Sequence, residues 1–141
     1  MISVLYVDDE RDLCDISRIF LERGGEFEVA TAISAQEAID LLHLASYDVI
    51  ISDYSMPGMD GIAFLKAVRE RFGDVPFILF SGRGREEVVI EAINNGADFY
   101  IQKGGDPKSQ FAELRHKIRQ AARRKQAERF LRESERRLAD I

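Results

Sequence analysis

Acidic residues follow two short apolar segments of this 141-residue chain, at positions where they could bind a cation. Asp8 and Asp9 come directly after residues 3–7, and Asp53 comes directly after residues 48–52. Three carboxylates held close together repel one another and raise one another's pKa values. A hard divalent cation removes this conflict, and Mg2+ takes oxygen ligands from one or two carboxylates and from water. If the fold brings these residues together, they form a Mg2+ site.

A hydroxyl group and an ammonium group follow two further apolar segments. Ser81 comes after residues 76–80, and Lys103 comes after residues 98–102. A cation and a lysine beside a free carboxylate suit the handling of phosphate, because the positive charges screen the approach of the anion while a carboxylate oxygen attacks phosphorus. The set as a whole indicates phosphoryl transfer onto an aspartate.

The elements that must position these residues alternate between two hydrophobic periods. Short segments that are rich in β-branched and aromatic residues and bounded by Asp or Gly are predicted strands: 3–7, 27–31, 48–52, 76–80 and 98–102. The stretches between them carry apolar residues at helical spacing, for example Leu13, Ile16, Phe20 and Leu21. Ser34 followed by Glu37 predicts a capping box at the start of the second helix.

Five strand-helix units in series predict a doubly wound α/β fold, with a five-stranded parallel sheet covered by helices on both faces. In such sheets the chemistry lies beyond the carboxyl ends of the strands. Asp8, Asp9, Asp53, Ser81 and Lys103 all follow predicted strands, so they are expected at one edge of the sheet.

The last segment departs from this alternation. After Asp106 and Pro107, an N-cap and a first-turn proline, the chain has no Gly or Pro and predicts one helix of roughly 50 Å. We expect a domain over residues 1–122 and a helical extension over 123–141. Ala127, Leu131, Ser134, Leu138 and Ile141 of the extension follow a 4-3-4-3 spacing. This two-heptad pattern is short for a coiled coil, and the extension is a candidate coiled-coil linker.

Composition excludes several classes of protein. No apolar run approaches the ~20 residues of a membrane span, and the amino terminus lacks the pattern of a signal peptide. A single cysteine, Cys14, fits a reducing compartment and is predicted to be inert packing. We therefore expect a cytoplasmic protein without membrane contact. Residues 1–114 hold 21 acidic against 10 basic side chains, a net charge of −11, which speaks against nucleic-acid binding by this part of the chain.

Taken together, these residues resemble the receiver domain of two-component response regulators over residues 1 to about 122. The resemblance rests on the acid pair Asp8-Asp9, the DYSMPGMDG loop that opens with Asp53, Ser81, Tyr100 and Lys103, in this order and at these distances. It implies a flavodoxin-like sheet with strand order 2-1-3-4-5.

The resemblance also implies a role for each matched residue. Asp53 would be the phosphoacceptor, and Asp8 and Asp9 would hold Mg2+ with an oxygen of Asp53 and the backbone carbonyl of Ser55. The resemblance implies that Ser81 and Lys103 contact phosphoryl oxygens and that the backbone N–H groups of Tyr54 and Gly82 complete the cradle. Tyr100 would swing inward as Ser81 is drawn to the phosphate. The signal would then pass through the fourth helix, the fifth strand and the last helix.

Two features depart from the family's pattern. Receivers usually have a proline after the lysine, whereas Gly104 and Gly105 follow Lys103 here, so this loop is expected to be more pliable. Arg83 and Ser55 occupy positions whose side chains modulate hydrolysis of the phosphoaspartate in the family.

The resemblance implies a sensor histidine kinase as phosphodonor and a protein that catalyses only its own phosphorylation and dephosphorylation. Three alternatives stay open. A phosphatase of the haloacid dehalogenase type would need a second aspartate at the position of Ser55, and a flavodoxin-like cofactor binder would need a phosphate loop in place of Asp8-Asp9. A receiver-like scaffold would act through its helix without phosphorylation.

The basic last segment also has three interpretations. It is a solvated helix with ion pairs at i,i+4 spacing, or a helix that forms a homodimer or transmits the signal to a further module. The stretch ERFLRESERRL resembles linkers that join receivers to PAS or kinase modules, so a fused module is a candidate partner. Nucleic-acid binding is not expected, because the segment has no second helix for a helix-turn-helix and no aromatic platform.

Overall fold

The computed structural model describes residues 1–82 and 86–139. The strands in this part of the chain are β1 (Ile2–Val7), β2 (Phe27–Ala32), β3 (Val49–Ser52), β4 (Phe77–Ser81) and β5 (Phe99–Gln102). The helices are α1 (Arg11–Glu22), α2 (Ala35–Leu44), α3 (Gly61–Phe72), α4 (Glu86–Asn94) and α5 (Pro107–Ala139). Each predicted strand is present, with its bounds within one residue of those expected.

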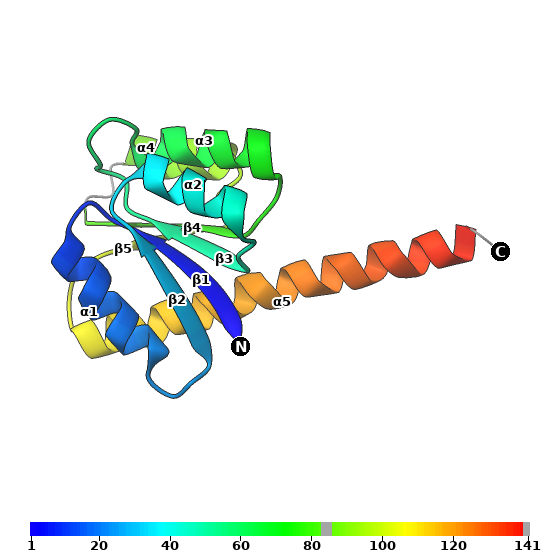
Figure 1. The fold of residues 1–141 in the computed structure, drawn as a ribbon, viewed down its shortest axis with the longest axis horizontal. Helices are drawn as coiled ribbons and strands as arrows, with labels where there is room; N and C mark the ends of the chain where they lie inside the picture. Colours follow the sequence, from blue (N-terminus) through cyan, green and yellow to red (C-terminus); the bar gives the residue numbers. More distant parts are fainter. Residues whose placement is uncertain (83–85, 140–141) are drawn as a thin grey trace.

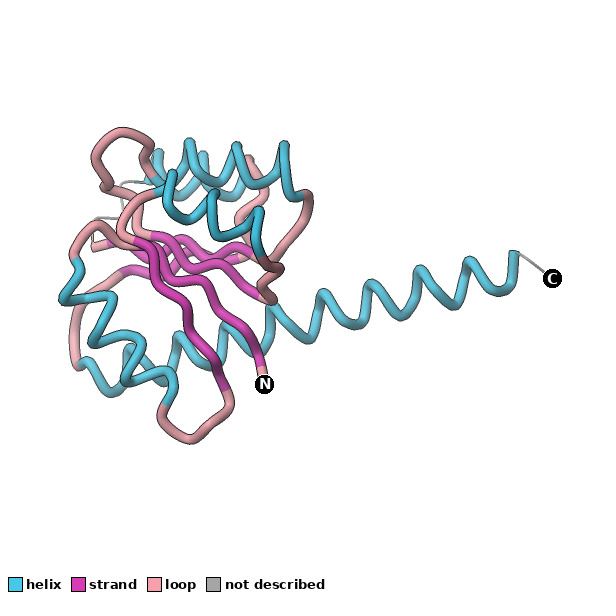
Figure 2. Tube along the Cα trace, in the orientation of Figure 1, coloured by secondary structure: helices cyan, strands magenta, loops and turns pink. Residues whose placement is uncertain are grey.

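The strands form a parallel sheet in the order β2-β1-β3-β4-β5. Figures 1 and 2 show helices α2, α3 and α4 on one face of the sheet and helices α1 and α5 on the other. The predicted doubly wound α/β fold and its strand order are therefore confirmed.

Alternation along the central strands divides the core into two layers. Leu5 and Val7 of β1 pack beneath α2, α3 and α4, whereas Val4 and Tyr6 pack against α1 and α5. All four residues are buried. Because both faces of the sheet are covered, both sets of alternate positions are apolar, and the strands read as nearly continuous apolar runs.

Helix α1 differs from the prediction. Its buried residues are Cys14, Ser17 and Leu21, and Ile16 is 45% exposed. The buried face therefore includes the predicted Leu21 but is otherwise displaced by one residue, about 100° around the helix. The stripe Leu13, Ile16, Phe20 and Leu21 is broad, and sequence spacing alone does not tell which side of it meets the sheet. Cys14 is buried as predicted, and its Sγ donates to the Asp8 carbonyl oxygen at 3.2 Å.

Capping side chains mark where helices α2 and α5 begin. The Ser34 hydroxyl accepts from the Glu37 N–H at 3.1 Å, as the predicted capping box requires. The Glu37 carboxylate, however, reaches back to the Ile33 N–H instead of that of Ser34. The Asp106 carboxylate accepts from the Ser109 N–H at 3.2 Å, which confirms the predicted N-cap of α5.

Helix α5 runs without interruption through the predicted boundary after residue 122. Leu114, Ile118 and Ala121 are buried against the sheet, and the ring of Phe111 stacks on that of Phe20. The helix then leaves the sheet and projects away from it (Figure 1). None of the described helices is long and apolar enough to cross a membrane.

A cluster of charged residues, which we call the basal cluster, surrounds α5 where it leaves the sheet. It comprises Arg69 at the end of α3, Asp74 in the α3-β4 loop, Asp98 before β5, and Lys125 and Arg132 of α5. Asp74 pairs with Lys125, whose side chain is 10% exposed, and lies 3.6 Å from Arg132. Contacts between α5 and the rest of the chain therefore continue to residue 132.

Candidate functional site

Strand register places the acidic residues side by side. Val7 of β1 is paired with Ser52 of β3, so the residues that follow these two strands start at neighbouring positions. The Asp53 N–H donates to the Val7 carbonyl oxygen at 2.9 Å, and the Asp8 N–H donates to the Ala32 carbonyl oxygen at 3.1 Å. Backbone pairing thus continues one residue past each strand and holds both aspartates at the carboxyl edge of the sheet.

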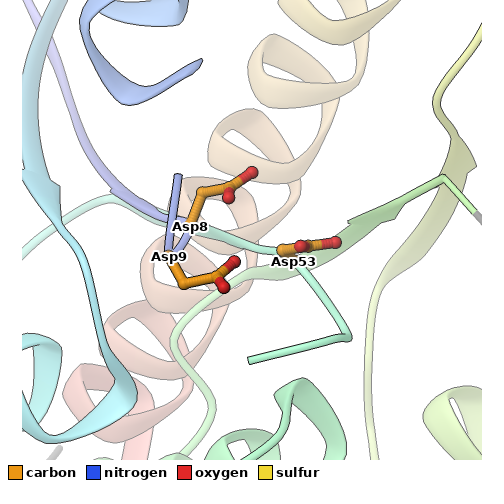
Figure 3. Close-up of side chains that lie close together, drawn as sticks. All are labelled: Asp8, Asp9 and Asp53. Carbon is orange, nitrogen blue, oxygen red and sulfur yellow. The ribbon is translucent and has the colours of Figure 1, made fainter. Parts of the chain in front are cut away.

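Asp8, Asp9 and Asp53 form an acidic cluster in this part of the fold (Figure 3). Each contributes one carboxylate oxygen to a set whose members lie within 4.8 Å of one another. Asp8 is 1% exposed, Asp53 is half-buried and Asp9 is exposed. The predicted convergence of these three side chains is therefore present.

Lys103 lies between two of these carboxylates. Its Nζ is 2.8 Å from Asp8 Oδ2 and 3.6 Å from Asp53 Oδ1. The ammonium also lies 5.4 Å from the centre of the Phe80 ring, within the range of a cation-π contact. Within residues 1–82 and 86–139, Lys103 is the cation that faces these three carboxylates, so these four side chains together keep an excess of negative charge.

This arrangement of charges and burial shifts the pKa of Asp53. Burial raises the pKa of the Asp53 carboxyl group, the Lys103 ammonium opposes that effect, and the Asp8 carboxylate adds to it. The Tyr54 N–H donates to Asp53 Oδ1 at 2.9 Å and favours the ionised form. The expected mutual effect of the acids on their pKa values is thus present at Asp53, although burial is its largest cause.

The remaining predicted residues lie around this centre. Ser81 ends β4, is buried and accepts at its carbonyl oxygen from the Lys103 N–H at 2.8 Å, and the exposed Gly82 follows it. Ser55 is exposed in the loop after Asp53. Their contacts with phosphate or Mg2+ stay predictions, and Arg83 lies outside the described residues.

Of the predicted site residues that the structure describes, Tyr100 has a buried side-chain oxygen without a hydrogen-bond partner. Its ring is half-buried and packs against the core layer beneath α4. Its hydroxyl oxygen is buried and has no hydrogen-bond partner among the described residues, and burial followed by the Asp53 charge raises the pKa of the phenol. An unpartnered buried hydroxyl destabilises the conformation that contains it, by roughly 1–3 kcal/mol.

Two supporting residues were not predicted. A Cβ at Gly61 would overlap the Asp53 carbonyl oxygen and would lie 2.9 Å from the Leu79 side chain, so only glycine fits where α3 starts beneath the Asp53 loop. Gln110 of α5 accepts from the Gly104 N–H at 3.0 Å and donates to the Gln102 carbonyl oxygen at 2.7 Å. These bonds hold the Gly104-Gly105 loop, in which both glycines have positive φ angles.

The donor set fits Mg2+. All three side chains offer oxygen, the atom type that this cation takes. Asp8 already uses both carboxylate oxygens, one with Lys103 and one with the Glu10 N–H, whereas Asp9 is exposed. Asp9 and Asp53 are therefore the better candidates for direct ligands, with Asp8 binding through water.

Comparison with known proteins agrees with this geometry. Residues 4–132 match the response regulator receiver domain family, and the chain belongs to this family. The response regulator Rre1 of Synechocystis is 38% identical over 108 residues, which cover 75% of this chain and 47% of the relative. The chain thus spans about half the length of the curated relatives it matches.

Solved structures give the same result. A receiver domain from Clostridium thermocellum is 28% identical and superposes with a TM-score of 0.81, covering 90% of this chain and 98% of that one. The response regulator TrrA of Thermotoga maritima, solved in complex with Mg(2+)-BeF, is 27% identical with a TM-score of 0.75. The match covers 86% of this chain and 99% of TrrA.

Proposed function

We propose that Asp53 accepts a phosphoryl group from the phosphohistidine of a sensor histidine kinase. An oxygen of the Asp53 carboxylate attacks phosphorus, the bond between phosphorus and the histidine nitrogen breaks, and the electron pair returns to the imidazole. The product is a phosphoaspartate, which water then hydrolyses. In this proposal the chain acts on itself and turns over no external substrate.

The observation that carries the proposal is the position of Asp53 beside Lys103 and close to two other carboxylates. The Asp53 carboxylate is half-buried, it lies 3.6 Å from a lysine ammonium, and the Tyr54 N–H is 2.9 Å from one of its oxygens. Fixed positive groups beside the attacking oxygen stabilise the charge that develops on the transferred phosphoryl group. The relationship to TrrA, solved with Mg(2+)-BeF, supports the same assignment.

We further propose that Mg2+ is held by Asp9, Asp53 and the Ser55 backbone carbonyl, with Asp8 bound through water. The bound ion would supply positive charge against the phosphoryl oxygens. Asp8 also holds the Lys103 ammonium at 2.8 Å, and this contact positions it beside Asp53. The Gly82 N–H and the Ser81 hydroxyl would contact the remaining phosphoryl oxygens.

The proposed switch uses Ser81 and Tyr100. Movement of Ser81 toward the phosphoryl group would open space for the Tyr100 ring, and rotation of the ring would relieve the unpartnered hydroxyl described above. Helix α4, strand β5 and helix α5 carry or adjoin these residues, and we propose that they carry the signal. The output is a contact with another protein module, such as a fused PAS or kinase module, and we assign the reaction to the cytoplasm.

Two alternatives receive less support. Ser55 occupies the position where a phosphatase of the dehalogenase type would need its acid, and its hydroxyl is a poor proton donor by comparison. A scaffold that acts without phosphorylation would not need Asp53, Asp9 and Lys103 together. Only the assay below separates this alternative from a receiver.

The experiment is incubation with acetyl phosphate, with and without Mg2+, followed by intact-mass spectrometry. We expect the wild-type chain to gain one phosphoryl group only when Mg2+ is present and Asp53→Asn to gain none. Asp15→Asn, which removes an exposed acid on α1, is the matched control and should be labelled like the wild type. Full labelling of Asp53→Asn would exclude the assignment, and the same assay with a phosphorylated kinase domain tests the scaffold alternative.

A further inference from the structure

The end of α5 presents two different faces. Lys125, Glu128, Arg129 and Arg132 recur at spacings of three and four residues, so they lie on one side of the helix. This side meets the rest of the chain, since Lys125 and Arg132 reach Asp74 and Arg129 lines a hollow with Tyr47 and Phe72.

The opposite side carries the apolar spacing. Ala127, Leu131, Ser134 and Leu138 form what we call the seam, and Ile141, the fifth position of the predicted spacing, lies outside the described residues. Ala127 lies two residues from both Lys125 and Arg129, and at ~100° per residue this places the seam on the far side of the helix. Leu131 is 59% exposed and Leu138 is 71% exposed. The seam therefore faces away from the sheet and its helices, where a partner can reach it.

We propose that this seam binds the same segment of a second copy of the chain, as a parallel, in-register two-stranded coiled coil. In this coiled coil Leu131 and Leu138 occupy a positions, and Ala127 and Ser134 occupy d positions. Each of these residues packs against the same residue of the second copy. Lys125 and Arg132 of the basal cluster lie on the side of α5 opposite the seam. The sheet of each copy would therefore lie on the side of its helix that faces away from the second helix. The proposal does not depend on phosphorylation of Asp53.

Charge favours the parallel orientation. In this register the e positions are Glu128 and Glu135, and the charged g positions are Arg123 and Arg137. A parallel pair places g beside e of the partner, so Arg123 meets Glu128 of the second copy. An antiparallel pair places e beside e and brings Glu128 against Glu135, which repel. Phe130, an exposed aromatic residue, lies at a g position and extends the apolar contact.

Cross-linking tests the proposal in the intact chain, because two heptads give a weak dimer that dilution would separate. Cys14 is 1% exposed, so a single introduced cysteine reports on its own position. Ala127→Cys places a thiol at a core position, where a parallel pair brings it within disulfide range of its counterpart. Gln126→Cys is the matched control, because residue 126 is one residue away and is also exposed.

Under mild oxidation we expect Ala127→Cys to form a disulfide-linked dimer at least about tenfold faster than Gln126→Cys. Adding Leu131→Asp and Leu138→Asp should reduce the rate to that of the control. These side chains are exposed, so unchanged circular dichroism and thermal unfolding should accompany the loss. An Asp53→Asn background should leave the cross-linking rate unchanged, which separates this proposal from the one on phosphorylation.

Equal rates for Ala127→Cys and Gln126→Cys would overturn the proposal. So would an antiparallel result, in which a mixture of Ala127→Cys and Leu138→Cys chains links residue 127 to residue 138 faster than residue 127 to itself. A fast reaction at residue 127 that survives both Leu→Asp changes would also contradict it, because the seam would not be the contact.

Discussion

The two edges of the sheet hold similar residues in opposite electrostatic states. At the carboxyl edge of the described structure, Asp8, Asp9 and Asp53 face Lys103, and the pKa of Asp53 is raised. In the basal cluster at the other edge, Asp74 faces Lys125 and Arg132, and the hydrogen bond from Lys125 holds the pKa of Asp74 below its usual value. Among the described residues, the carboxyl edge has more carboxylates than cations, whereas the acids of the basal cluster are paired with basic side chains.

This difference separates a binding site from a structural contact. Uncompensated carboxylates in a partly buried position gain from a cation that neutralises them, so the carboxyl edge is arranged for a ligand. Paired charges at the basal cluster gain nothing from a ligand, and Arg69 there donates to the carbonyl oxygens of Gly73, Val75 and Gly96. The basal cluster instead fixes the loops and helix α5 to one another.

The largest effect is expected from Gly61→Ala. The added methyl group would overlap the Asp53 carbonyl oxygen and press on Leu79, so we expect a loss of about 3 kcal/mol in the free energy of unfolding by urea denaturation. Gly82→Ala is the control at the same edge, where an added Cβ meets no described atom within 4 Å and the loss should be below about 0.5 kcal/mol. Equal effects of the two changes would show that close packing beneath the Asp53 loop is unimportant.

Lys103→Met should come next. It leaves the Asp8 carboxylate, which is 1% exposed, without its cation, and we expect a loss of roughly 1–3 kcal/mol in the free energy of unfolding without Mg2+. Lys108→Met, at an exposed position, should change little. Saturating Mg2+ should recover part of the loss in the Lys103 variant. A loss that is the same with and without Mg2+ would argue against a cation site at this edge.

Asp74→Asn should have a smaller effect. Asp74 is 60% exposed, so screening limits the expected loss in the free energy of unfolding to about 1 kcal/mol or less. Amide hydrogen exchange in residues 123–132 should accelerate as the contact of α5 with the α3-β4 loop weakens. Glu70→Gln, an exposed acid on α3, is the control, and unchanged exchange in the Asp74 variant would remove the structural role of the basal cluster.

The smallest expected effect is the pH dependence of the changes in the free energy of unfolding caused by Asp53→Asn and Asp74→Asn, measured without Mg2+. A raised pKa means that the folded chain loses stability as Asp53 ionises, so Asp53→Asn should become more stabilising as the pH rises from 3 to 7. A lowered pKa means that stability from Asp74 is lost as the pH falls through the folded pKa, so Asp74→Asn should become more destabilising over the same rise. Slopes of the same sign would contradict the comparison between the edges.

Most of the fold was predictable because its strands are short apolar runs bounded by Asp or Gly. The convergence of Asp8, Asp9, Asp53 and Lys103 also followed from the rule that chemistry lies at the carboxyl ends of parallel strands. The side of α1 that meets the sheet did not follow, because Ile16 and Leu21 both belong to one broad apolar stripe.

Other features depend on contacts between distant residues. Gly61 is required because α3 starts against the Asp53 backbone, and its place in the DYSMPGMDG loop carries no sign of that overlap. Gln110 and Lys125 resemble ordinary polar residues of an exposed helix in the sequence. Their roles arise from the Gly104-Gly105 loop and from Asp74, which lie elsewhere in the chain.

Because α5 is one unbroken helix of 33 residues held near its middle by the contact between Lys125 and Asp74, it has the geometry of a lever with a fulcrum. About 18 residues lie between the Pro107 end and Lys125, and about 14 lie between Lys125 and Ala139, so the arms measure roughly 27 and 21 Å. If the contact between Lys125 and Asp74 holds, a tilt that moves the Pro107 end by about 2 Å moves the far tip by about 1.5 Å in the opposite direction. The length of the helix alone would then carry a displacement from one edge of the sheet to a point well outside it.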